Sequence, residues 1–277
     1  YPRKSAFRAG YVDGAQWDDD SLGNVSAAFG NSCVAKGPVC AAFGRENVAS
    51  GNYSFVMNYQ NVSSGQSAVA MGHETTADGS NSVSMGYNTT ANGDNSLALG
   101  RSTTTSGYAT VAMGFATTAT AKFSTVLGQY NVGGGDPNTW INTDPIFEIG
   151  IGADAANKAN ALTVLKNGHV EVGDATPDFP LEVDGKIAVN DSQIVYMPDQ
   201  TDFNSSLFVG TGGGSLSHST GEEGRNNAAF GIGAMNSVET GYNNTACGMT
   251  AMYANTSGYG NTALGMRALY NNSSGNK

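Results

Sequence analysis

The sequence predicts an all-β, fibrous protein built from two arrays of short repeated strands. Three observations predict this class: glycine recurs with a 14-residue period, a second array has a 17-residue period, and only 13% of the 277 residues are charged. Glycine occurs 38 times, and Asn, Ser, Thr and Ala dominate the remainder. Such residues bury little apolar surface each, so we expect the chain to gain burial by stacking its repeats and by association.

The first array occupies residues 23–133 and is predicted to form 14-residue coils, each with two strands and two turns. Glycine at every seventh position leaves segments too short for a helix and supplies the positive φ that tight turns need. Asn58 replaces one glycine of the first series, and Ala121 closes the second. The two series are Gly30, Gly44, Gly72, Gly86, Gly100, Gly114 and Gly128, and Gly23, Gly37, Gly51, Gly65, Gly79, Gly93 and Gly107.

Large apolar residues alternate with Ser or Ala ahead of each glycine of the first series. A period of two places alternate residues on opposite faces of a strand. A coil of this length is too narrow for two rows of Met and Leu, so we expect Ser and Ala to fill the coil. The large residues then face a neighbouring chain, and the predicted interface column is Val69, Met71, Val83, Met85, Leu97, Leu99, Val111 and Met113.

The segment Asn81-Ser-Val-Ser-Met-Gly-Tyr-Asn-Thr-Thr-Ala-Asn-Gly93, followed by Asn95-Ser-Leu-Ala-Leu-Gly100, resembles the head repeat of YadA-type trimeric autotransporter adhesins. The resemblance covers residues 23–130. It implies a left-handed parallel β-roll, with three chains side by side in a homotrimer, in an extended surface protein that binds host structures. Phage fibres reuse the same repeat, so the resemblance is more specific for fold than for function.

The 14-residue period ends at Gly133, and residues 134–210 are predicted to form a β-hairpin neck or adaptor. Asn167-Gly168 between two alternating segments is a strong signal for a hairpin turn, and Asp184-Gly185 repeats it. Residues 211–221 are rich in Gly and Ser and are expected to form a linker.

Residues 222–277 form a second array with a 17-residue period. Its units begin with Asn227-Ala-Ala-Phe-Gly231, Asn244-Thr-Ala-Cys-Gly248 and Asn261-Thr-Ala-Leu-Gly265. These units resemble the Asn-Thr-Ala-Leu-Gly repeats of phage and viral tail fibres, which an endosialidase-type intramolecular chaperone often follows. The chain begins without Met and ends just after Gly275. We therefore expect a fragment or processed product whose chaperone was removed or omitted.

Few residues suggest chemistry, and we expect a protein that is not an enzyme and has no metal or cofactor. Its histidines are His73, His169 and His218, which lie in different regions without the spacing of a metal or nucleophile motif. Residues 1–22 are expected to be a leader segment. The acidic run Asp18 to Asp20 within it is interpreted as solvated, in preference to a cation site.

The formal net charge of -10 disfavours nucleic acid and anionic membranes as partners. No apolar run approaches the length of about 18 residues that a membrane-spanning helix needs, so we expect no membrane insertion. The cysteines are Cys33, Cys40 and Cys247, which we interpret as buried free thiols because each occupies a repeat position held elsewhere by a small or apolar residue.

The residue after each glycine of the first series is large and varies chemically from coil to coil. Tyr and Arg are favoured at binding surfaces, so one interpretation is an exposed binding stripe for a receptor. The alternative, which we favour, is that these corner residues pack on neighbouring chains. The candidate binding stripe is Arg45, Tyr59, His73, Tyr87, Arg101 and Phe115.

Together these patterns favour a homotrimeric tail fibre or spike on a virion surface. We expect it to contact other virion proteins and to attach by many weak contacts to a glycan or protein of the host cell surface. A bacterial trimeric autotransporter-type adhesin on the outer membrane is the second interpretation, although the sequence has no sustained heptads of a coiled-coil stalk. A glycan-depolymerase tailspike is the third.

Overall fold

The computed structural model is all-β, as predicted. The residues that it describes are 4–183, 187–189, 192–196, 207–210 and 224–276. The chain divides into two compact units, Tyr1–Glu182 and Val183–Lys277. Helical structure in the described residues is limited to two 3-10 turns, η2 (Ala15–Trp17) and η3 (Asp19–Ser21). Neither turn has the length or apolar character that crossing a bilayer requires.

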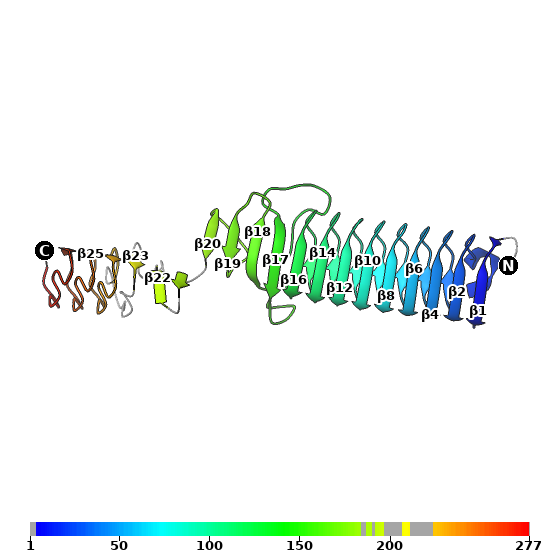
Figure 1. Ribbon diagram of the computed structural model, residues 1–277, viewed down its shortest axis with the longest axis horizontal. Helices are drawn as coiled ribbons and strands as arrows, with labels where there is room; N and C mark the ends of the chain where they lie inside the picture. Colours follow the sequence, from blue (N-terminus) through cyan, green and yellow to red (C-terminus); the bar gives the residue numbers. More distant parts are fainter. Residues whose placement is uncertain (1–3, 184–186, 190–191, 197–206, 211–223, 277) are drawn as a thin grey trace. The chain divides into compact units, whose positions relative to one another are not determined.

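The first unit is a parallel β-solenoid in which each 14-residue coil carries one long and one short strand (Figure 1). Equivalent strands of successive coils pair in register, as Gly86 does with Gly100. The long strands are β1 (Phe7–Tyr11), β2 (Ala27–Asn31), β4 (Ala41–Arg45), β6 (Phe55–Tyr59), β8 (Val69–His73), β10 (Val83–Tyr87), β12 (Leu97–Arg101), β14 (Val111–Phe115) and β16 (Thr125–Gln129). The short strands are β3 (Val34–Ala35), β5 (Val48–Ala49), β7 (Val62–Ser63), β9 (Thr76–Ala77), β11 (Thr90–Ala91), β13 (Thr104–Thr105) and β15 (Thr118–Ala119).

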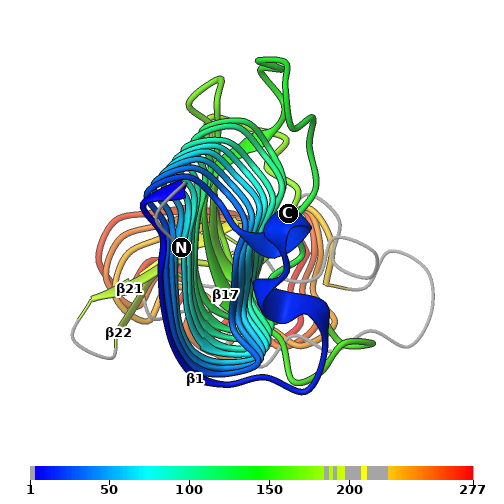
Figure 2. The same ribbon diagram turned by 90° about the vertical axis from the view of Figure 1, so that its right-hand side faces the viewer.

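Small side chains fill the interior of the coils, which confirms the expectation from the alternation. The second residue of each long strand from β2 to β16 is buried, and so is the second residue of each short strand. Viewed along the stack, the coils superpose closely, so these residues form continuous interior columns (Figure 2). The interior residues of the long strands are Ala28, Ala42, Val56, Ala70, Ser84, Ala98, Ala112 and Val126, all 0% exposed.

Stacking of the coils also pairs several of the polar side chains inside them. The Asn61 side-chain amide donates to Asn47 Oδ1 at 3.1 Å, and the Asn61 backbone N–H donates to the same oxygen at 2.8 Å. Asn61 Oδ1 in turn accepts the hydroxyl and the backbone N–H of Thr75. Because buried polar groups require hydrogen-bond partners, this ladder holds the corner of these three coils in register.

Strand β1 lies inside the segment that was expected to be a leader, so the sheet begins before the predicted array. It pairs parallel with β2, and Gly10 aligns with Gly30. The separation of these two glycines is longer than one repeat, and a search for a 14-residue period therefore misses the first of them.

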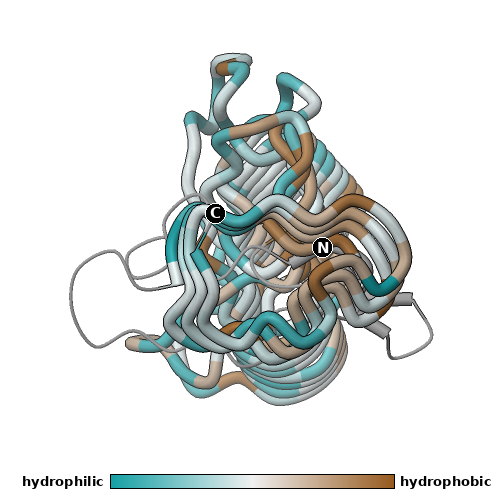
Figure 3. Tube along the Cα trace, turned by 90° about the vertical axis from the view of Figure 1, so that its left-hand side faces the viewer, coloured by the Kyte–Doolittle hydropathy of each residue, from teal (hydrophilic) through white to brown (hydrophobic). Residues whose placement is uncertain are grey.

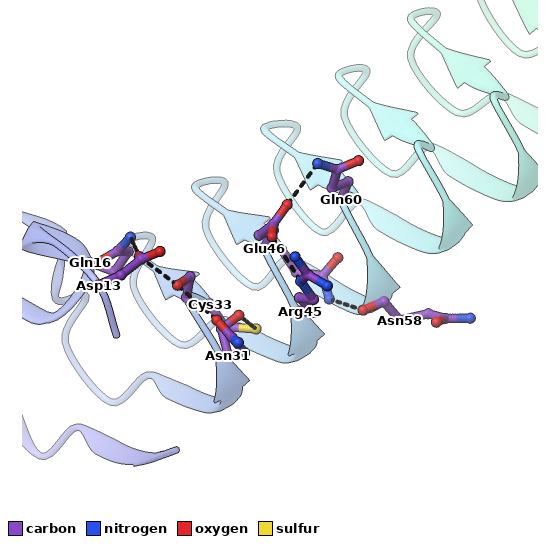
Figure 4. A network of polar contacts seen from close by, with 10 residues as sticks. Asp13, Gln16, Asn31, Cys33, Arg45, Glu46, Asn58 and Gln60 are labelled. Atoms are coloured by element: carbon purple, nitrogen blue, oxygen red, sulfur yellow. Dashed lines mark hydrogen bonds and ion pairs between the residues drawn. The ribbon is translucent and has the colours of Figure 1, made fainter. Parts of the chain in front are cut away.

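Asp13 ties this amino-terminal segment to the following coil. It accepts hydrogen bonds from Ser32 Oγ at 2.8 Å and from Gln16 Nε2 at 2.9 Å (Figure 4). The hydrogen bond from Ser32, and then that from Gln16, hold the pKa of Asp13 below its ordinary value. The Trp17 indole N–H donates to the Cys33 carbonyl oxygen at 3.2 Å, which attaches the same segment to the solenoid at a further point.

Beyond the predicted array, β17 (Pro145–Ile151) pairs parallel with β16 and extends the same sheet. Its Gly150 aligns with Gly128, which precedes it by more than one repeat. Strands β18 (Asn160–Leu165), β19 (Val170–Val172) and β20 (Leu181–Val183) complete the sheet. The predicted neck therefore begins with a further strand of the solenoid, which the change of spacing conceals.

Asn167-Gly168 forms the predicted hairpin turn, between the antiparallel strands β18 and β19. The second predicted turn, Asp184-Gly185, and the predicted linker at residues 211–221 lie outside the described residues.

A buried carboxylate organises the end of the solenoid. Glu148 on β17 is 2% exposed, and its oxygens accept the side-chain amides of Asn131 and Asn160, each at 2.7 Å, and the backbone N–H of Gly133 at 3.1 Å. Three donors on one buried carboxylate offset the loss of its hydration. The segment that follows β16 is thereby attached to β17 and β18.

The second unit has six described strands in one sheet. They are β21 (Ile187–Val189), β22 (Ser192–Tyr196), β23 (Leu207–Val209), β24 (Ala228–Phe230), β25 (Thr245–Cys247) and β26 (Thr262–Leu264). Strands β23 to β26 pair parallel, and β24, β25 and β26 follow one another with the predicted 17-residue period.

An asparagine ladder also stabilises the second unit. Asn227 Oδ1 accepts the backbone N–H and the side-chain amide of Asn244, and Asn244 Oδ1 accepts those of Asn261. All three asparagines are buried. The second array thus uses the same polar device as the first array, although its period differs.

Of the three cysteines, all are free, but only two are buried. Cys33 and Cys40 lie inside the coils as predicted, whereas Cys247 is exposed. The interpretation of Cys247 as buried was wrong because it occupies the third position of a strand, whose second position, Ala246, faces the interior.

Replacing Gly86 by Ala is expected to destabilise the first unit by more than about 2 kcal/mol. A Cβ there would lie 1.9 Å from the carbonyl oxygen of Gly100, and φ is +130°. Gly134→Ala is the matched control, because its φ is +118° but nothing lies within 4 Å of the added carbon. Denaturant unfolding followed by circular dichroism measures both variants. Equal losses of stability would contradict the role of the inter-coil contact.

Cys33 and Cys40 are expected to resist thiol reagents in the folded protein. Burial raises the pKa of Cys40 to about 11 and also raises the pKa of Cys33, so little thiolate forms near pH 8. Iodoacetamide labelling and mass spectrometry should find both thiols unmodified in buffer and modified in guanidinium chloride. Rapid modification of Cys40 in buffer would show that the interior of the coils is open.

Candidate binding surfaces

The candidate binding stripe is a continuous ladder of side chains at the ends of the long strands. Each member is the last residue of its strand, and in-register parallel pairing places neighbours at the interstrand spacing of about 4.8 Å. The His73 ring lies 4.9 Å from the Tyr59 ring and 4.9 Å from the Tyr87 ring, with the latter pair stacked at 4°. The structure therefore brings the predicted residues together, and they contact one another.

Two arginines take part in this ladder as cations over aromatic rings. The Arg45 guanidinium lies 5.3 Å from the centre of the Tyr59 ring. Arg101 lies 5.5 Å from the Tyr87 ring and 5.4 Å from that of Phe115. Such contacts are worth about 0.5 to 1 kcal/mol each at exposed positions. Arg45 also pairs with Glu46 at 2.8 Å (Figure 4), so part of its charge is neutralised within the chain.

The ladder limits what this stripe can bind. Because the stacked rings cover each other's faces, a ligand meets ring edges and the polar groups at their ends. The stripe is thus suited to hydrogen bonding along the sheet edge, and poorly suited to stacking of an external ring.

The predicted interface column runs beside the stripe on the same face of the sheet. Its residues occupy the first and third positions of the strands β8, β10, β12 and β14, and all of them are half-buried in the single chain. At the neighbouring coils Phe29 and Met57 are exposed at the equivalent positions. Large exposed apolar patches of this kind mark interaction surfaces.

The second unit also carries apolar columns on its outside. Hydrophobic positions recur at the same place from coil to coil (Figure 3). The outer residues of the strands include Phe230 and Leu264, the latter 79% exposed. A second column follows two positions later, at Ile232, Met249 and Met266.

The residues considered for chemistry remain apart. His73 belongs to the stripe, His169 lies in the hairpin turn after β18, and His218 is outside the described residues. The described residues contain no group of three or more His, Cys, Asp or Glu side chains arranged to hold a metal ion.

An aromatic cluster that no sequence pattern indicates lies at the opposite turn of the coils. Tyr108 and Phe123 come from turns of successive coils, and their ring centres are 5.6 Å apart in an edge-to-face pair. Trp140, from the segment between β16 and β17, lies 6.3 Å from Phe123. Only the return of that segment against the coils brings Trp140 to this place, and no sequence pattern indicates the return.

The family model of the YadA head domain repeat matches residues 63–89, 77–103 and 106–131. The predicted YadA-like repeats are thus confirmed over these residues. The match suggests an adhesin-type fibre that is exposed at a surface. No curated protein matches the chain.

Replacing His73 by Ala is expected to lower the free energy of unfolding by about 1 to 2 kcal/mol, because it removes ring contacts with both Tyr59 and Tyr87. Gln66→Ala, in an exposed turn of the same coil, is the control and should change stability by less than about 0.5 kcal/mol. Denaturant unfolding of both variants makes the comparison. A ladder that contributes nothing would give two equal, small effects.

Proposed function

We propose that this chain is the structural and receptor-binding part of a homotrimeric surface fibre that attaches to host cells by multivalent adhesion. The observation that carries the proposal is the apolar column of Val, Met and Leu on the outside of coils that match YadA head repeats. A single chain leaves this column half-exposed, and association of three chains buries it. Adhesion, not catalysis, is the activity.

A repeated fibre suits this activity because each trimer presents the same surface three times. Weak contacts made together convert later binding events into intramolecular ones, which raises the overall affinity steeply. We place the fibre on a virion, where it contacts other virion proteins, because the 17-residue units resemble tail-fibre repeats. The match to YadA head repeats favours the second candidate, a bacterial trimeric adhesin on the outer membrane.

The assembly is tested by a charge in the apolar column. The parent protein should have a solution mass three times the 28.4 kDa of one chain, measured by light scattering after gel filtration. Met85→Asp should shift the mass to that of a monomer, because three buried carboxylates without partners would be strongly unfavourable.

Thr90→Asp is the matched control, since Thr90 is equally half-buried but lies on the outer side of the short strand β11. It should remain trimeric. A monomeric parent protein, or a trimer that tolerates Met85→Asp, would overturn the assembly.

Adhesion is tested with labelled parent and Met85→Asp proteins on a panel of bacterial, algal and animal cells. We expect the trimer to bind bacteria or algae and the monomer to bind at least tenfold more weakly, through loss of avidity. Binding to animal cells alone would favour the bacterial adhesin. Release of reducing ends from capsular polysaccharide would show a depolymerase instead, and binding to no cell would contradict adhesion.

A further inference from the structure

A polar pocket of about 180 Å³ lies at the turns of two successive coils, on the corner that carries the aromatic cluster. The turn before β12 contributes three of its residues and the turn before β14 contributes two more. The segment between β16 and β17 closes one side with Asn138. The lining residues are Asn92, Gly93, Asp94, Ser106, Tyr108 and Asn138.

Hydrogen bonds fix the segment that closes the pocket. The backbone N–H of Tyr108 donates to the Pro137 carbonyl oxygen at 2.9 Å, and that of Lys122 donates to the Asp136 carbonyl oxygen at 2.9 Å. The Asp136 carboxylate accepts the backbone N–H groups of Asn138 and Thr139. These two hydrogen bonds also hold the pKa of Asp136 below its ordinary value. Asn138 is therefore held in place by the fold.

The residues of the pocket depart from the rest of the array. Tyr108 occupies a turn position that is Gln66, Ser80 and Asp94 in the three preceding coils. It is 40% exposed, and Phe123 and Trp140 beside it are 42% and 48% exposed. A polar hollow lined by Tyr108 thus lies at the end of the array that carries the closing segment. Phe123 packs against Tyr108, and Trp140 packs against Phe123.

The chemistry of the lining indicates the ligand. Carboxamide and hydroxyl groups donate to and accept from neighbouring hydroxyls, and a carboxylate accepts from them. The C–H face of a sugar ring packs on an aromatic side chain. The lining has one carboxylate and no basic side chain, which disfavours anionic groups in the hollow itself. The ammonium groups of Lys122 and Lys166 lie over the rings of the aromatic cluster, 5.2 to 5.4 Å from the ring centres. Ligand sites of this kind combine a concave surface with a few placed polar groups.

We propose that this pocket binds a neutral sugar residue of a cell-surface glycan. Tyr108 packs against the ring of the sugar, while Asp94, Asn92 and Asn138 bond its hydroxyls. Phe123 and Trp140 extend the contact to the next residues of the glycan. The inference rests on the proposed adhesion and specifies its ligand class and its site.

The test uses the full chain on an array of neutral and anionic oligosaccharides. The parent protein should bind neutral hexose or N-acetylhexosamine oligosaccharides. Tyr108→Ser and Asn138→Ala should each weaken this binding at least tenfold. Serine is chosen because Ser80 occupies the equivalent position of another coil, so the turn should fold normally. Circular dichroism of each variant checks this.

Tyr53→Asn is the matched control, because Tyr53 is an exposed aromatic residue of another turn and its equivalent positions hold Asn81 and Asn95. Its binding should equal that of the parent protein. Binding confined to anionic oligosaccharides, binding unchanged in Tyr108→Ser, or binding to no glycan would each overturn the proposal.

The same variants on whole cells separate this inference from the proposed function. Cell binding that survives Tyr108→Ser would reject the pocket and leave adhesion standing. Glycan binding without attachment of the parent protein to any cell would support the pocket and reject adhesion as the function.

Discussion

The contact between each glycine and the backbone of the following coil is the constraint on which the solenoid depends. At Gly30, Gly72 and Gly114 the carbonyl oxygen of the next coil occupies the place where a Cβ would lie, at distances of 1.9 to 2.0 Å. The positive φ of these residues excludes a side chain a second time. Coils can therefore approach closely only in register. Equivalent residues at every other position of the coil are aligned in the same way.

The shared register explains both the interior and the outside of the coils. Interior columns consist of Ala, Ser, Val, Thr, Asn and Cys side chains, because the space between the two sheets of a coil is narrow. On the outside, equivalent residues of successive coils lie one interstrand distance apart. The rings of Tyr59, His73 and Tyr87 therefore contact one another. A change of an outward-facing residue in one coil therefore alters one step of a column.

The sequence was sufficient for features that repeat, and insufficient where spacing changes. The 14-residue coils, the small interior residues and the hairpin at Asn167-Gly168 follow from local pattern, which period and turn chemistry encode directly. Strands β1 and β17 pair with the array across separations longer than one repeat. The 14-residue period therefore does not predict them. The place of Trp140 depends on how a long connection returns to the coils, and that is a tertiary contact without a local signal.

The change of spacing also creates the proposed binding pocket. Gly128 and Gly150 keep the inter-coil contact although their separation exceeds the 14-residue repeat, so the added residues leave the sheet without disturbing it. Freed from the interior columns, they carry Asn138 and Trp140 to the turns of earlier coils. Variation concentrates in connections of this kind because the rigid elements do not depend on them. The inserted segment therefore contributes Asn138 to a pocket that the repeated coils alone do not form.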